Sequence, residues 1–103
     1  MTDVTVTHAP DRHRFEARLD GRLAGFADYQ QTPELWVFTH TEVDPAFEGR
    51  GVGGALVRGA LDHVREDGTR TVLAICPFVR AWIERNPGYA DLLYRARPST
   101  VDD

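Results

Sequence analysis

Four glycines stand within one ten-residue stretch, FEGRGVGGAL, which spans residues 47–56. The stretch joins an apolar run typical of a strand to an apolar run typical of a helix. Glycine loses more conformational entropy on folding than any other residue, so this cluster indicates a need for bare backbone. The start of a helix offers unpaired N–H groups and a partial positive charge, which together bind phosphate oxygens. The stretch therefore predicts a phosphate-binding loop.

Two common phosphate-binding loops fit the rest of the chain poorly. Gly49, Gly51 and Gly54 match the G-x-G-x-x-G of dinucleotide sites. However, five residues separate the preceding strand from the first glycine, and the next strand ends in Cys76 rather than in an acid that holds a ribose. The P-loop needs a lysine after its last glycine, and the chain contains no lysine. We therefore disfavour the first loop and reject the second.

The first half of the chain predicts an antiparallel meander. Polar and apolar residues alternate, or β-branched and aromatic residues gather, in four segments. Asp20 and Gly21 form a two-residue hairpin signal between the second and third of them. The predicted strands are residues 3–8, 14–19, 22–30 and 35–43.

The second half predicts a β-α-β unit with a short final helix. An amphipathic helix of about four turns follows the glycines and ends at Gly68. The nearly unbroken apolar run at residues 71–76 is typical of a strand covered on both faces. A helix at residues 78–86 is expected to point Phe78, Trp82 and Ile83 inward. We expect one domain over residues 1–94 and a flexible tail over residues 95–103.

Three blocks in fixed order then resemble one superfamily. EGRGVGG is similar to the Q/R-x-x-G-x-G/A pyrophosphate loop of GNAT N-acetyltransferases. HTEV, GRGVGGALV and CPFV…IERNPGYADL together resemble its single-domain members of roughly one hundred residues, over about residues 40–93. The resemblance implies a minimal GNAT fold, α/β with a mixed sheet, that binds acetyl-CoA or another acyl-CoA and acylates an amine. The amine can be a small molecule or part of a protein.

The same resemblance implies where the acyl donor lies. A backbone N–H of Glu42 or Val43 polarises the thioester carbonyl, and the pantetheine arm lies between the strands at 35–43 and 71–76. The pyrophosphate rests on the N–H groups from Arg50 to Ala55, a set that includes Gly51, Val52, Gly53 and Gly54. Cys76 flanks the thioester.

Three positions depart from the pattern of the superfamily or its branch. Glu48 replaces the usual Gln or Arg, and its negative charge reduces affinity for a pyrophosphate unless Arg50 compensates. Asn86 stands where this branch often has His, and Gly88 where it often has Glu. These two departures concern the side of the acceptor.

Four side chains are candidates for acid–base or covalent chemistry. By strand parity His40 and Glu42 share a side with Trp36 and Phe38, and either can act as general base or be an ordinary strand residue. Cys76 can attack acetyl-CoA, assist the departing thiolate, or be a small buried hydrophobe. Tyr89 can act as general acid or pack the short helix onto the sheet.

Composition restricts the class of protein. The formal net charge of −4 argues against nonspecific nucleic-acid binding. The chain has no apolar run of membrane-span length, no signal-peptide core and no zinc spacing, and its single cysteine fits a reducing compartment. We expect a cytoplasmic enzyme without a metal.

The alternatives are a CoA-binding or protein-interaction module without turnover, and thioester hydrolysis through Cys76. Sequence leaves the oligomeric state open.

Overall fold

The computed structural model describes residues 3–95. Four strands form an antiparallel meander and a fifth joins it in parallel, in the order β1-β2-β3-β4-β5. This is the predicted mixed sheet. The strands are β1 (Val4–Ala9), β2 (Arg14–Leu19), β3 (Arg22–Gln31), β4 (Leu35–Val43) and β5 (Thr71–Ala74). Asp20 and Gly21 both have positive φ, as the predicted tight hairpin requires.

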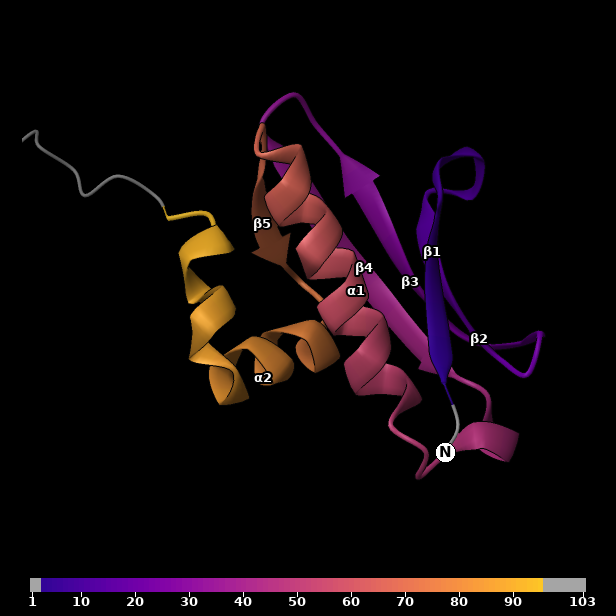
Figure 1. The fold of residues 1–103 in the computed structure, drawn as a ribbon. Helices are drawn as coiled ribbons and strands as arrows, with labels where there is room; N and C mark the ends of the chain where they lie inside the picture. Colours follow the sequence, from indigo (N-terminus) through magenta and orange to yellow (C-terminus); the bar gives the residue numbers. More distant parts are fainter. Residues whose placement is uncertain (1–2, 96–103) are drawn as a thin grey trace, which may run out of the picture.

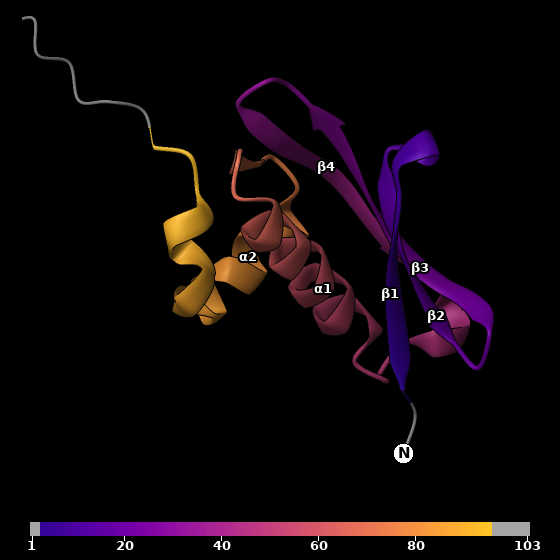
Figure 2. The same cartoon turned by 45° about the horizontal axis from the view of Figure 1, so that its top comes forward.

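One long helix covers one face of the sheet. Helix α1 (Val52–Asp67) contacts the first four strands, and α2 (Pro77–Arg85) and the 3-10 segment η3 (Pro87–Leu92) lie beside it on the same side (Figures 1 and 2). The predicted apolar stripe of α1 is buried, and its members are Val52, Leu56, Val57, Ala60, Leu61 and Val64. Gly68 ends the helix in the left-handed conformation, as predicted.

The prediction that the fifth strand is covered on both faces is wrong. Leu73 and Ile75 are exposed, whereas Val72 is fully buried. The reason is that β5 is the outermost strand in the order and the helices lie on one face only. The strand is also shorter than predicted, because it ends at Ala74 and Cys76 already precedes α2.

Phe78 also departs from its predicted place. Trp82 and Ile83 are buried as expected, but Phe78 is 40% exposed. A Cβ on Gly53 would lie 2.5 Å from the Phe78 ring, so the ring rests on the first turn of α1 rather than in the core. The glycine makes room for this contact.

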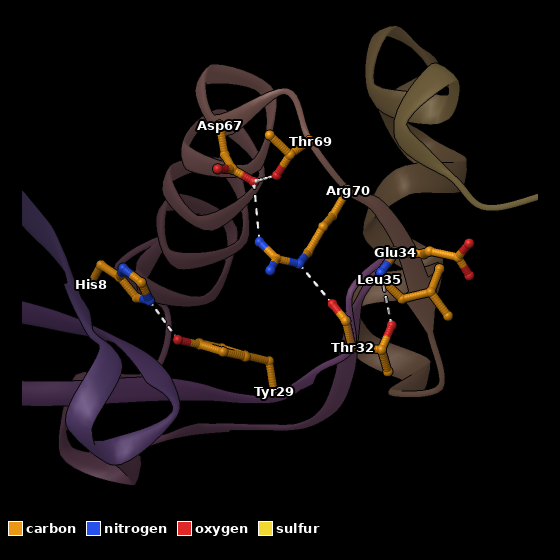
Figure 3. A network of polar contacts seen from close by, with 8 residues as sticks. All are labelled: His8, Tyr29, Thr32, Glu34, Leu35, Asp67, Thr69 and Arg70. Carbon is orange, nitrogen blue, oxygen red and sulfur yellow. Dashed lines mark hydrogen bonds and ion pairs between the residues drawn. The ribbon is translucent and has the colours of Figure 1, made fainter.

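A polar network joins the two turns at one end of the sheet (Figure 3). The Arg70 guanidinium donates to the Thr32 carbonyl at 2.7 Å and lies 3.8 Å from an Asp67 carboxylate oxygen. The Thr32 hydroxyl in turn accepts from the backbone N–H of Leu35 at 2.9 Å. These bonds connect the β3–β4 turn to the segment between α1 and β5. They hold β5 in register against β4, where Leu35 pairs with Thr71.

No helix within residues 3–95 is long and apolar enough to cross a membrane. The expected tail begins at the last described residue, Arg95, and otherwise lies outside the described residues.

Candidate active site

A β-bulge in β4 decides which side chains meet. The pairing of β3 with β4 shifts so that Asp28 faces His40 while the next residue, Tyr29, faces Phe38. Thr39 is therefore the extra residue, and the alternation of sides is interrupted there. Phe38 is buried beneath α1, whereas the His40 and Glu42 side chains are exposed. Sequence parity placed His40 and Glu42 on the side of Trp36 and Phe38, and the bulge makes that prediction wrong.

His40 and Glu42 nevertheless remain together. Their side chains lie on the open face of the sheet, with His40 Nε2 3.3 Å from Glu42 Oε2. The His40 ring also lies near Phe26 of β3, with 6.2 Å between ring centroids. The two candidate bases therefore form a pair beside an aromatic ring.

The bulge turns Thr41 toward Cys76. Thr41 pairs with the buried Ala27, and its hydroxyl oxygen lies 3.3 Å from the Cys76 sulfur. Sequence reasoning overlooked Thr41, although it lies between the two candidate bases in HTEV. Only recognition of the bulge identifies it, because side-chain alternation without a bulge puts it on the opposite face.

Cys76 occupies the point where β4 and β5 separate. The two strands pair from Leu35↔Thr71 to Phe38↔Ala74. The Ile75 and Cys76 N–H groups then both donate to the Phe38 carbonyl, at 3.0 and 2.9 Å, and the chain enters α2. Cys76 is 4% exposed and is the N-cap residue of α2.

The glycine stretch forms an open hollow at the start of α1. Gly51 is the N-cap with φ 75°, and the first intrahelical bond runs from Ala55 N–H to the Gly51 carbonyl. The N–H groups of residues 52–54 therefore have no intrahelical acceptor. The hollow has a volume of about 260 Å³, and we call it the glycine hollow; its lining is Val43, residues 47–49, residues 51–54 and Phe78.

The hollow contains part of the predicted donor site. Val43, Gly51, Val52, Gly53 and Gly54 line it, whereas Arg50 and Ala55 flank these residues in the chain. Its lining includes Glu48 and no cation. Backbone amides are therefore its favourable groups for an anion.

The Tyr89 side chain bonds to α1 and packs on α2. Its hydroxyl donates to an Asp62 carboxylate oxygen of α1 at 2.7 Å, and this bond and partial burial raise the pKa of the phenol. Its ring packs on Trp82 at 5.0 Å between centroids. Arg65 fixes the same segment by bonds to Asp91 and to the Gly88 carbonyl. Tyr89 therefore joins η3 to α1.

This fold and this glycine-lined helix start define a class of protein. A family model described as GCN5-related N-acetyl-transferase matches residues 14–92. The chain therefore belongs to the GCN5-related N-acetyltransferase family, the GNAT superfamily of the sequence resemblance.

Individual relatives agree with this assignment. Protein NATD1 from Xenopus tropicalis is 32% identical over 91 residues, which cover 84% of this chain and 80% of the relative. The N-alpha-acetyltransferase RimI of Mycobacterium tuberculosis is 41% identical over 61 residues, or 55% of this chain and 39% of RimI.

Solved structures share the fold. A GCN5-like protein from Staphylococcus aureus superposes with a TM-score of 0.67 at 20% identity, over 94% of each chain. The ribosomal-protein-S18-alanine N-acetyltransferase of Escherichia coli gives a TM-score of 0.63 at 18% identity, over 84% of this chain and 76% of the other. The mixed five-stranded sheet is thus that of the superfamily.

Proposed function

We propose that this protein transfers an acetyl or other acyl group from acyl-CoA to an amine. The observation that carries the proposal is the glycine hollow. It joins the free N–H groups of α1 to Val43, on the stretch of β4 that extends beyond its pairing with β5. A related fold has been solved with acetyl-CoA, in a predicted acetyltransferase from Clostridium acetobutylicum, at a TM-score of 0.51 and 8% identity over 86% of this chain and 61% of the other.

The chain's own groups suit such a donor. The amides of residues 52–54 can bind the pyrophosphate oxygens, since a helix N-terminus favours anions. Arg50 and Ala55 continue this segment on either side. The N–H of Glu42 or Val43 would polarise the thioester carbonyl, and the pantetheine arm would lie where β4 and β5 separate.

His40 and Glu42 would prepare the amine. An ammonium must lose a proton before its nitrogen can attack, and the His40 imidazole can accept a proton. Glu42, 3.3 Å from His40, would orient the imidazole and stabilise it once it is protonated. Cys76 would assist the departure of the CoA thiolate, or would first accept the acyl group as a nucleophile. We assign Tyr89 a structural role instead of acid catalysis, because its hydroxyl is bonded to Asp62.

One observation favours a second function. Glu48 in the lining of the glycine hollow weakens an anion site, which fits a domain that binds CoA without turnover. Thioester hydrolysis through Cys76 is a further alternative and needs a water molecule as acyl acceptor.

The experiment measures CoA release from acetyl-CoA, with and without a panel of amines, for the wild type and for Cys76→Ser, His40→Gln and Glu42→Gln. An amine-dependent transferase should lose turnover in at least one variant that still binds acetyl-CoA. Release without amine supports hydrolysis. Binding without any release would overturn the transferase.

Intact-mass spectrometry then assigns the role of Cys76. A nucleophilic Cys76 retains an acetyl group when acetyl-CoA is supplied without amine, and Cys76→Ser does not release CoA in this half-reaction. A group that only assists the leaving thiolate gives no acetylated protein.

A further inference from the structure

A second hollow lies on the opposite, open face of the sheet. Residues 23–26 of β3 and residues 42–45 at the end of β4 line it, and its volume is about 230 Å³. We call it the outer hollow. Phe26 and Glu42 face each other across the two strands, on the same face as His40 and away from α1.

The two hollows meet at one residue. Val43 belongs to the lining of both, and each of the other lining residues belongs to one hollow only. The end of β4 therefore borders both the glycine hollow and the outer hollow. Molecules in the two hollows would approach this strand from opposite sides.

The lining of the outer hollow has an anionic part and an apolar part. Glu42 and Asp44 contribute carboxylates, and none of the eight lining residues is cationic. Asp44 Oδ1 accepts from the Ala46 N–H at 2.9 Å, which fixes this carboxylate and leaves Oδ2 able to accept another bond. Leu23, Phe26 and Pro45 supply the apolar surface, and the Arg14 guanidinium, itself paired with Glu16, lies over the Phe26 ring at 4.6 Å from its centroid.

We propose that the outer hollow binds the acyl acceptor, a primary ammonium on an apolar stem. This inference rests on the proposed function and adds the class of substrate. The carboxylates attract the ammonium and the apolar surface takes the stem, so an anionic amine of the same size is disfavoured. A free amine and the amino terminus of a polypeptide share this chemistry.

The position of the outer hollow also fits direct transfer, in which the amine attacks the thioester without an acylated Cys76. Glu42 lies in its lining and His40 is 3.3 Å from Glu42, so the bound ammonium can give one proton to the His40 imidazole. The nitrogen lone pair then forms the bond to the thioester carbon. The bond from carbon to sulfur breaks, the sulfur keeps the electron pair, and the second proton from nitrogen goes to that sulfur. The products are the amide and free CoA.

The test maps binding without turnover. We would record amide spectra of the ¹⁵N-labelled full chain at neutral pH, titrated with phenethylamine and, separately, with 2-phenylethanol, which has the same apolar stem and no charge. The amine should shift the amides of residues 23–26 and 42–44, and the alcohol should leave them unchanged. Equal binding of the alcohol, or shifts confined to other residues, would overturn the proposal.

Two matched variants sharpen the test. Leu23 and Leu73 are similarly exposed, at 39% and 37%, and only Leu23 lines the hollow. Leu23→Arg places a like charge beside the ammonium and should weaken phenethylamine binding by more than about ten-fold. Leu73→Arg should change it by less than about two-fold. Equal effects of the two variants would contradict the assignment.

Two further titrations distinguish a free amine from a polypeptide amino terminus, and the present inference from the proposed function. The first titration uses a short peptide amide that has an apolar first side chain and a free amino terminus, and compares it with the N-acetylated form of the same peptide. The comparison shows whether the amino terminus of a polypeptide binds in the outer hollow. Acetyl-CoA should shift the amides of residues 51–54. If acetyl-CoA shifts these amides and phenethylamine does not shift those of the outer hollow, only the present inference fails. If acetyl-CoA does not shift the amides of residues 51–54, the proposed function fails.

Discussion

At the scale of single residues, Glu48 sets the electrostatics of the glycine hollow. Its carboxylate belongs to the lining, where a pyrophosphate would bring further negative charge. We predict that Glu48→Gln tightens acetyl-CoA binding by a factor of about 2–5, the size of one partly exposed charge interaction. Calorimetric titration measures this. Glu66→Gln is the control, because it removes the same charge in the last turn of α1 and should not change the affinity for acetyl-CoA. Weaker acetyl-CoA binding by Glu48→Gln would contradict the account.

His8 gives the folded state a dependence on pH. Burial, and secondarily the charge of His63, lower the pKa of His8 below its ordinary value of 6.5. The ring stacks on Phe15 at 4.6 Å and bonds to the Tyr29 hydroxyl (Figure 3). The unfolded chain therefore takes up this proton at a higher pH than the folded chain does. It follows that the free energy of unfolding decreases as the pH falls below 6.5.

Urea denaturation between pH 7.5 and pH 5 checks this prediction. His8→Gln should flatten the dependence over this range, at the cost of some stability at neutral pH. His13→Gln is the matched control, because His13 lies beside the same strands in a turn. A wild-type protein that becomes more stable on acidification through this range would disprove the assignment.

A third residue-scale prediction concerns Glu16. This carboxylate is 5% exposed and bonds to Arg14 and Arg18, each at 2.9 Å, and these bonds lower its pKa. Glu16→Gln should lower the free energy of unfolding at pH 7 by about 1–3 kcal/mol, because it removes charge-assisted bonds in a shielded place. The loss should shrink as the pH falls below the ordinary pKa of 4.5, where the unfolded chain takes up the proton, and should vanish only below the lowered pKa of Glu16 in the folded protein. Urea denaturation measures this dependence on pH. A decrease in the free energy of unfolding that is equally large at every pH would contradict the role of the Glu16 charge.

At the scale of elements, the close approach of β3 to β4 depends on Gly25. A Cβ there would lie 2.6 Å from the Glu42 carbonyl oxygen, a backbone atom that cannot move aside alone. Gly25→Ala should therefore destabilise the fold by about 1–3 kcal/mol and disturb the outer hollow. Gly88→Ala, where a Cβ meets nothing within 4 Å, should be nearly neutral in the same thermal unfolding experiment. Equal stabilities for the two variants would contradict this packing.

The elements also show what sequence can predict. The strands β2 and β4 and the helix α1 start and end as their patterns predict, because alternation, glycine caps and proline breaks are local signals. The bulge at Thr39 is not local, since it exists only in the pairing with β3. One inserted residue moved His40 and Glu42 to the open face and brought Thr41 to Cys76. The sequence thus predicted the bounds of β4 correctly and the directions of the His40, Thr41 and Glu42 side chains incorrectly.

At the scale of the whole molecule, the helices leave one face of the sheet to solvent. Because the helices lie on one side of the sheet (Figure 2), Leu73 on β5, Ile75 just after it and the outer hollow at β3 and β4 are exposed. The apolar run of β5 was typical of a buried strand, and only the strand order reveals that β5 is an edge. The family resemblance predicted the fold correctly. The outer hollow, which we propose as the acceptor site, is formed by the pairing of β3 with β4, and no short motif describes it.

The central claim is that the glycine hollow binds the pyrophosphate of an acyl-CoA. The most direct measurement is thermal unfolding with acetyl-CoA, CoA and NADH in separate titrations. A ligand at about one hundred times its dissociation constant adds roughly 2.7 kcal/mol, which corresponds to about 10 °C or more for a domain of this size. We predict that shift for both CoA compounds and none for NADH. No shift with either CoA compound, or an equal shift with NADH, would contradict the account.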